Sequence, residues 1–465
     1  MHARDSPSHS PSPHSPSLGA TTTTRPVTVS EAKGVDRVRL CVERYPEILW
    51  LADEHVRVTE EARATSRDSY SEQLFGKKYI EFDRTVMTLH CLKLILDGGD
   101  DAYRQFTAAQ PERVRLTGES FKALHRQGRA LLTSGLQGMS ESEMMRAMEA
   151  ALVLGDIGKS ARARELFKAY GAQAPDHDDF YGEVVRILQK KPDLCPTFGS
   201  LTSGAQKLIT RAAHLVHYGH ITHMEGGPDM FSELRKSGVA VDFPLILTFS
   251  YFIHICDVAG ASGHVNRQSS LAYTEPSHLA IRGVLESCGV LANPDKTEKD
   301  AYDAYLAVRA SWLGFGTRDR TDRVLTRMGA MLRLFTPEEG AVLRAAVATL
   351  SPGVQSRIIE QLDVGGGEEP VRTPTYMPAM LINLANNPRL GVSREERLSR
   401  AVILGFPFIA RVLRSHRERL ARLEADPATP LCFNGVAGVA KTDPDALGGE
   451  YRIDPEGNVR LSGMW

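Results

Sequence analysis

The stretch RAMEAALVLGDIGKSARARELF, residues 146 to 167, contains an apolar run with helical spacing that stops at an aspartate, Asp156. Just before it, Ser140 and Glu143 have the spacing of a capping box, and apolar residues then recur every three or four positions. We therefore predict a helix that begins near Ser140 and ends near Asp156.

The same helical periodicity extends over most of the chain. The last residues, YRIDPEGNVRLSG, instead alternate around a turn sequence and predict a short hairpin. The sequence thus predicts an all-α fold with a C-terminal β-hairpin. We divide it into a disordered Ser/Pro/Thr-rich tail (1–30), a first helical domain (31–297), a second helical region (298–424) and a C-terminal extension with the hairpin (425–465).

The composition excludes several classes of protein. The 56 basic and 57 acidic residues give a net charge of -1, so a dedicated nucleic-acid-binding role is not expected. The chain has no apolar run of the roughly 18–20 residues that cross a membrane, and it has no secretory signal. Its six cysteines form no C-x-x-C pair. These features predict a cytoplasmic protein without a membrane partner.

The Gly158-Lys159-Ser160 sequence suggests a phosphate-binding loop, but its context does not fit one. That loop requires a glycine five positions before the Gly-Lys pair, where Val153 stands, and a strand leading into the loop. Since the preceding segment has helical spacing, we reject nucleotide binding through such a loop.

Asp156 instead fits a metal site with several other residues. His125 lies 31 residues earlier in a second helical stretch, ESFKALHRQGRALL. Imidazole and carboxylate suit a first-row divalent metal. Downstream, His220 and His223 share a helix face, and Asp257 follows an apolar run in which an unpaired acid would be costly to bury.

This order of motifs resembles the HD-domain superfamily of metal-dependent phosphohydrolases. The resemblance covers about residues 120–265, from His125 through ALVLGDIGK and the histidine-rich segment to the aspartate of ICDVAG. It implies an all-helical core in which His125 is the first metal ligand, Asp156 belongs to the His-Asp pair and Asp257 is the last ligand. In the branches that bind two metals, His220 and His223 would serve the second metal.

The sequence departs from the family at the pair itself. Gly155 stands where the family has histidine, which removes one ligand from the first metal. His217 or His254 is a candidate replacement. We interpret His177, in PDHDDF, as a solvated loop residue and not as a ligand.

The resemblance leaves three functions open. The first is hydrolysis of a nucleotide or other small phosphorylated molecule by water bound to one or two divalent ions (Mn, Mg, Fe, Co or Zn), with Lys159 steadying the anionic substrate. The second is an iron-dependent HD-fold oxygenase of a small polar substrate, similar to myo-inositol oxygenase. The third is a degenerate HD module that binds a ligand without catalysis.

Overall fold

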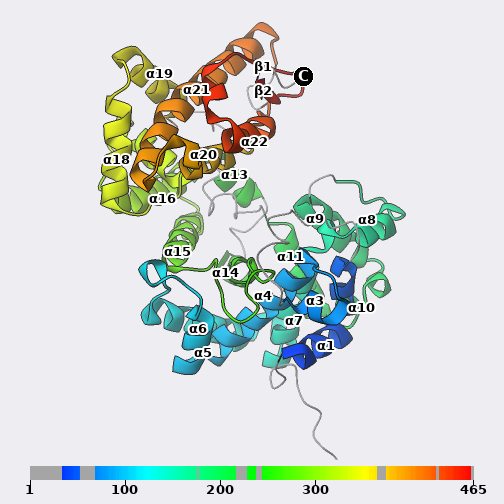
Figure 1. The fold of residues 1–465 in the computed structure, drawn as a ribbon. Helices are drawn as coiled ribbons and strands as arrows, with labels where there is room; N and C mark the ends of the chain where they lie inside the picture. The colour runs from blue at the N-terminus through cyan, green and yellow to red at the C-terminus, as the bar shows by residue number, and fades with distance from the viewer. Residues whose placement is uncertain are drawn as a thin grey trace, which may run out of the picture.

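The computed structural model of the protein describes residues 34–52, 69–174, 177–215, 228–236, 243–363, 373–425 and 429–461. Over these residues the protein is helical apart from one short pair of antiparallel strands near the C-terminus. This confirms the predicted all-α fold with a terminal hairpin. The helices form two groups, and Figure 1 shows the N-terminal group below the C-terminal one. The predicted tail, residues 1–30, lies outside the described residues.

The N-terminal group contains the region that resembles the HD domain. Its helices are α1 (Gly34–Arg44), α3 (Tyr70–Phe75), α4 (Ile80–Asp97), α5 (Gly99–Thr107), α6 (Gly118–Leu132), α7 (Glu141–Gly155), α8 (Ala161–Lys168), α9 (His177–Leu188), α10 (Pro196–Gly199), α11 (Ser203–Ala213), α13 (Pro228–Lys236), α14 (Phe243–Gly260) and α15 (Glu275–Val290). The predicted capping box is present at the start of α7, where the hydroxyl of Ser140 accepts from the Glu143 amide.

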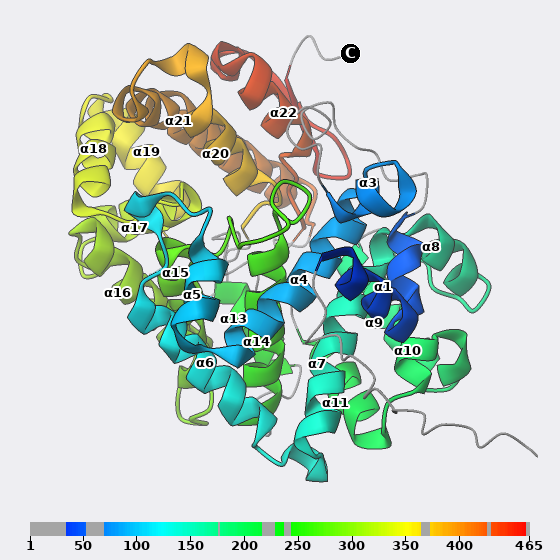
Figure 2. The same cartoon turned by 60° about the horizontal axis from the view of Figure 1, so that its bottom comes forward.

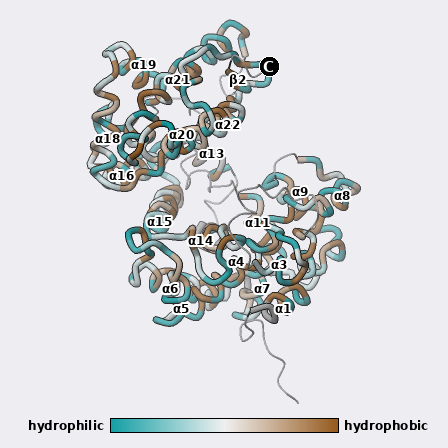
Figure 3. Tube along the Cα trace, in the orientation of Figure 1, coloured by the Kyte–Doolittle hydropathy of each residue, from teal (hydrophilic) through white to brown (hydrophobic). Residues whose placement is uncertain are grey.

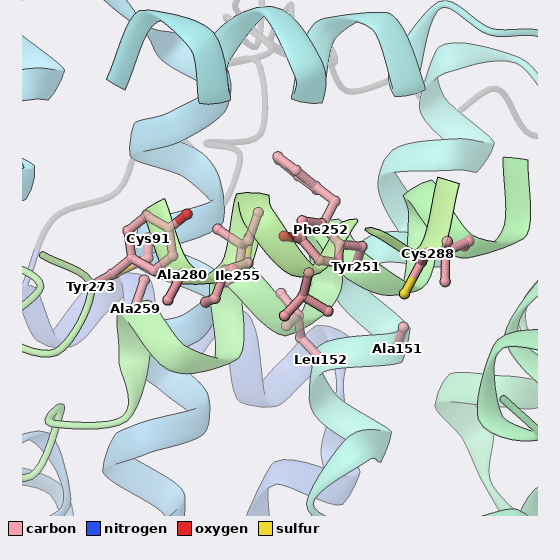
Figure 4. Close-up of a cluster of buried hydrophobic side chains, with 14 of the residues drawn as sticks. Cys91, Ala151, Leu152, Tyr251, Phe252, Ile255, Ala259, Tyr273, Ala280 and Cys288 are labelled. Carbon is pink, nitrogen blue, oxygen red and sulfur yellow. The ribbon is translucent and has the colours of Figure 1, made fainter. Parts of the chain in front are cut away.

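The core of this group is built around α4 and α14, which lie side by side in Figures 1 and 2. α14 is apolar on nearly every face, FPLILTFSYFIHICDVAG, as expected for a helix that is covered on all sides. Figure 4 shows Phe252 and Ile255 of α14 beside Leu152 of α7 and Cys91 of α4. At Gly260 an added Cβ would overlap the backbone of Thr88, so glycine allows the end of α14 to approach α4.

The C-terminal group consists of α16 (Glu298–Leu313), α17 (Arg320–Met331), α18 (Pro337–Ala348), α19 (Pro352–Leu362), α20 (Met377–Asn386), α21 (Arg394–Arg422), α22 (Asn434–Thr442), β1 (Tyr451–Ile453) and β2 (Val459–Leu461). The strands pair with Arg452 opposite Arg460. Figure 3 shows that hydrophilic and hydrophobic residues are interspersed along most helices of both groups.

The two groups meet through α13, α15 and α16. Both α13 and α15 pack against α16, and Nε of Arg235 on α13 lies 2.8 Å from a carboxylate oxygen of Glu298 on α16. The predicted domain boundary at 297/298 therefore falls between two helices that pack on each other. None of the described helices is long and apolar enough to cross a membrane.

Candidate functional site

A pocket of about 400 Å³ lies where α7, α9, α11 and α14 meet. This volume falls within the range of small-molecule sites, about 300–1,000 Å³. Part of the wall is apolar, with residues such as Ile209 and Phe249. The polar side chains in the wall are those of Asp156, Asp178, Asp179, Tyr181, Arg186, His214, Ser250, His254 and Asp257.

Asp156 enters the pocket because α7 ends at Gly155, which leaves the aspartate as the residue that caps the helix. The next three residues, Ile157–Lys159, form one tight turn. This turn brings Nζ of Lys159 to 2.7 Å from Oδ1 of Asp156, and the same ammonium lies 3.1 Å from Oε2 of Glu81 on α4. No strand precedes this turn, so the described structure agrees with the rejection of a phosphate-binding loop.

The first turn of α4 adds a second cation, Arg84, to this cluster. One of its terminal nitrogens lies 3.0 Å from Oε1 of Glu81, while its buried Nε has no hydrogen-bond partner among the described residues. Burial acts to lower the pKa of Arg84, but the carboxylates of Glu81, Asp156 and Asp257 outweigh it and raise the pKa. The Arg84 guanidinium is therefore held in its charged form between these acids.

Two of the carboxylates in the pocket wall, Asp257 and Asp156, have pKa values that shift in opposite directions. For Asp257, burial and then the nearby Asp156 carboxylate raise the pKa to about 7. For Asp156, burial also acts to raise the pKa, but the cations Lys159 and Arg84 outweigh it and the net pKa is lowered. Both residues line the same pocket, so the structure brings Asp156 and Asp257 together.

The start of α9 lies against the turn after Asp156. A Cβ at Gly158 would overlap the carbonyl oxygen of His177, so only glycine permits this contact. Arg164 holds the two segments together, because its guanidinium donates to the carbonyls of Gly158 at 2.7 Å and Ala174 at 3.1 Å. These contacts place Asp178 and Asp179 in the pocket wall.

His214 lies at the end of α11 with its ring fixed by the helix. Its Nδ1 lies 2.6 Å from the carbonyl oxygen of Thr210. Because a carbonyl can only accept, Nδ1 carries the proton and Nε2 of the neutral ring keeps its lone pair. Metal-binding histidines are commonly oriented by such a bond. His254, one turn before Asp257 on α14, lines the same pocket.

A protein family described as a family of unknown function (DUF6829) matches residues 41–427 of the chain. The chain belongs to this family. The match begins within α1 and continues past the end of α21, so it covers the whole of the pocket and the C-terminal group as far as α21. No curated protein and no solved structure matches the chain.

The structure does not place His125 at the pocket, which corrects the prediction that it shares a metal with Asp156. Its Nδ1 lies 3.0 Å from the carbonyl oxygen of Ile95, near the end of α4, whereas Glu81 at the start of α4 contacts Lys159. Glu81 and Ile95 are 14 positions apart, or about 21 Å along the helix axis. Two donors that share a metal lie within about 4 Å of each other. The side chains of Lys159 and His125 are too short to bridge a separation of about 21 Å.

Two further predicted ligands, His220 and His223, lie outside the described residues, as does the candidate replacement His217. The prediction for His177 needs correction, since it is the first residue of α9 and not a loop residue. Its side chain is 38% exposed, its Nε2 lies 3.5 Å from Asp178, and it contributes to lowering the pKa of Asp156.

Four residues near Asp156 and Asp257 were not found from the sequence. Glu81 and Arg84 lie among buried residues of the helix IEFDRTVMTLHCLKLILD, and opposite charges at such positions are a recognisable sign of a buried ion pair. Asp178 and Asp179 belong to an acidic run that also suits a solvated loop, so their place in the pocket follows only from the contact of His177 with Gly158.

Proposed function

We propose that this pocket is the active site of a metal-dependent hydrolase that acts on a small phosphorylated molecule. The observation that carries the proposal is the gathering of Asp156, Asp257, His214 and His254 around one pocket from the ends of α7 and α11 and from α14. Carboxylate and imidazole are the side-chain ligands that first-row divalent metals use most.

The charge of the pocket wall also favours a metal. Among the described residues, four aspartates and one arginine, Arg186, line the pocket, so a bare phosphate group would be repelled. A bound divalent cation would be the largest local charge and would reverse this effect. An acidic pocket of this kind therefore suits a phosphorylated molecule only together with a metal ion.

The donor types fit a divalent cation, but the described residues do not complete a site by themselves. Among them, no group of three or more His, Cys, Asp and Glu side chains is arranged to hold a metal ion. The ammonium of Lys159 is bound to Asp156, so a metal ion would compete with it for that carboxylate. A bound metal thus requires a further donor besides the described ones, and His217, the predicted replacement that lies outside the described residues, is the candidate.

The resemblance to the HD-domain enzymes agrees with the proposal, because it implies a metal between Asp156 and Asp257. Such a metal would lower the pKa of a bound water and neutralise charge on a phosphoryl oxygen. The chain itself contributes the ionised carboxylate of Asp156 and the Nε2 lone pair of His214. Lys159, once released from Asp156, would place a positive charge beside the substrate phosphate.

A second candidate, a non-catalytic binding module, is favoured by one observation. Lys159 already neutralises both Asp156 and Glu81, and Gly155 provides no imidazole. Two cations, Lys159 and Arg84, would then take the place of the metal permanently. This candidate predicts a folded protein that binds neither Mn nor Zn stoichiometrically.

The two candidates can be separated by assaying phosphate release from a panel of nucleotides and sugar phosphates with added Mn, Mg, Co or Zn. The hydrolase predicts metal-dependent release that Asp257→Asn and His214→Gln abolish, while Asp193→Asn, an exposed aspartate outside the pocket wall, leaves it unchanged. Bound iron with dioxygen consumption would support an oxygenase instead. Absence of turnover with every metal, in protein that binds none, would support the binding module.

A further inference from the structure

A second pocket, of about 290 Å³, lies in the C-terminal group between α19, α21 and the turn Pro444–Gly448. Its wall combines apolar side chains, among them Leu404 and Phe408, with two arginines, Arg357 and Arg411. None of the described residues that line it is an aspartate or glutamate. This pocket belongs to a different group of helices from the acidic pocket and has the opposite charge.

The hollow has a cause in the sequence of α21. Pro407 lies inside this 29-residue helix and lines the pocket. Proline has no N–H to donate to the carbonyl of Ile403, one turn earlier, and its ring pushes against that carbonyl. A helix is bent or opened at such a position, and both Ile403 and Pro407 form part of the pocket wall.

Arg411 is fixed in place without a carboxylate. One terminal nitrogen donates to the carbonyl oxygen of Leu447 at 2.9 Å, and the guanidinium lies 5.9 Å and 5.8 Å from the ring centroids of Phe408 and Tyr451. Arg411 forms no ion pair with any described residue. Its rotamer is therefore set by these contacts, while its charge stays uncompensated.

Arg357 supplies the second charge from α19, across the pocket from α21. Its side chain is half-buried, and among the described residues it makes neither a hydrogen bond nor an ion pair. By contrast, Arg414, one turn beyond Arg411, is exposed and paired with Glu418 at 2.8 Å. Two cations without a carboxylate thus line one partly apolar pocket.

From these observations we infer that the second pocket binds a small organic anion, with a carboxylate or phosphate group between Arg357 and Arg411 and an apolar body against Leu404 and Phe408. A planar guanidinium can donate two parallel hydrogen bonds to a carboxylate or to a phosphate group. The volume lies near the lower end of ligand pockets, which favours a small body, and one aromatic ring fits within it. This site does not depend on the function proposed for the acidic pocket.

The inference is tested by isothermal titration calorimetry on the full chain with benzoate, phenylphosphonate and the neutral analogue benzamide. Phenylphosphonate has no ester bond, so hydrolysis at the acidic pocket cannot interfere. Benzoate or phenylphosphonate should bind at least about tenfold more tightly than benzamide. Arg357→Gln and Arg411→Gln should each weaken binding of that anion at least about tenfold. Arg414→Gln, the matched control, should bind as the wild type does.

Which of the two anions binds identifies the preferred oxyanion, and either one supports the inference. Because Arg411 also contacts Leu447, each variant is checked for folding by circular dichroism, and Arg357→Gln tests the site even if Arg411→Gln is unstable. Equal binding of benzamide and the anions, or unchanged binding in Arg357→Gln, would overturn the inference. So would loss of binding in Asp257→Asn together with full binding in both arginine variants, since the ligand would then lie in the acidic pocket.

Discussion

The Nζ atom of Lys159 lies 2.7 Å from Oδ1 of Asp156, three positions earlier in the chain. The same Nζ lies 3.1 Å from Oε2 of Glu81, so one ammonium links the start of α4 to the turn after α7. The side chains of Asp156 and Glu81 are only 14% and 15% exposed. This cation therefore both stabilises the site and occupies the carboxylate that a metal would need.

Replacing Lys159 by methionine should remove the ammonium that contacts two largely buried carboxylates, Asp156 and Glu81, and leave Arg84 as the nearby cation. We expect the free energy of unfolding in urea, measured without added metal, to fall by about 1–3 kcal/mol. Lys122→Met removes an exposed pair with Glu119 and should cost less than about 1 kcal/mol. Equal losses in the two variants would contradict the structural role of Lys159.

The same Lys159→Met variant should bind Mn or Zn more tightly than the wild type, because Asp156 no longer has a competing cation. Isothermal titration calorimetry of the metal-free protein with Mn or Zn measures the metal affinity separately from stability. An unchanged or weaker metal affinity would mean that Asp156 is not a ligand.

Introducing the missing imidazole should strengthen the metal site. An added Cβ at Gly155 meets nothing within 4 Å, and Gly155 lines the pocket. Gly155→His should therefore raise the affinity for a divalent metal by at least about tenfold, similar to the effects of other residues at metal sites. Gly155→Ala, which adds no ligand, should not. A histidine variant that behaves like the alanine variant would count against a metal between Asp156 and Asp257.

Gly158 should tolerate no side chain, in contrast to Gly155. A Cβ at Gly158 would overlap the carbonyl oxygen of His177, so Gly158→Ala must push α9 away from the turn. We expect a loss of about 1–3 kcal/mol in the free energy of unfolding. Gly155→Ala, in open space on a helix, should instead gain up to about 1 kcal/mol. If the two alanine variants were equally stable, the contact with α9 would not exist as described.

The fold and the site differ in how far the sequence predicts them. The helix that begins at Ser140 and ends before Asp156, and the hairpin that pairs Arg452 with Arg460, follow from local capping and turn signals. The meeting of Asp156 with Asp257 was predicted from the order of motifs. The capping and turn signals lie in short segments of the chain, whereas the order of motifs covers about residues 120–265.

The sequence-based predictions that were wrong at the site concern which helix ends lie close together. A separation of 31 residues allows His125 to lie near Asp156, but His125 packs at the far end of α4. Glu81 and Arg84 take part instead, through tertiary contacts that no local pattern encodes. Similarly, Asp178 reaches the pocket because Gly158 admits the backbone of His177.

A buried aspartate on α4 predicts a dependence of stability on pH. Burial raises the pKa of Asp83 to about 6, even though it accepts hydrogen bonds of 2.8 Å from the amide and hydroxyl of Ser71. The folded state therefore keeps a proton that the unfolded state loses near pH 4, so stability falls as pH rises from about 4 to about 6.

Urea unfolding at several pH values, compared with Asp83→Asn, isolates this effect. The wild type should lose stability relative to the variant over that interval and run parallel to it above about pH 6. A wild type that gains stability relative to Asp83→Asn with rising pH would show that the carboxylate is stabilised in its charged form.

The central claim is that the pocket between Asp156 and Asp257 holds a divalent metal. Elemental analysis by inductively coupled plasma mass spectrometry, on the wild type and on the double variant Asp156→Asn/Asp257→Asn, tests it directly. We predict one or two equivalents of metal in the wild type and their loss in the double variant. A wild type without metal after reconstitution with Mn, Fe and Zn would contradict the claim and leave the side chains of Lys159, Arg84 and Arg186 as the cations of the described site.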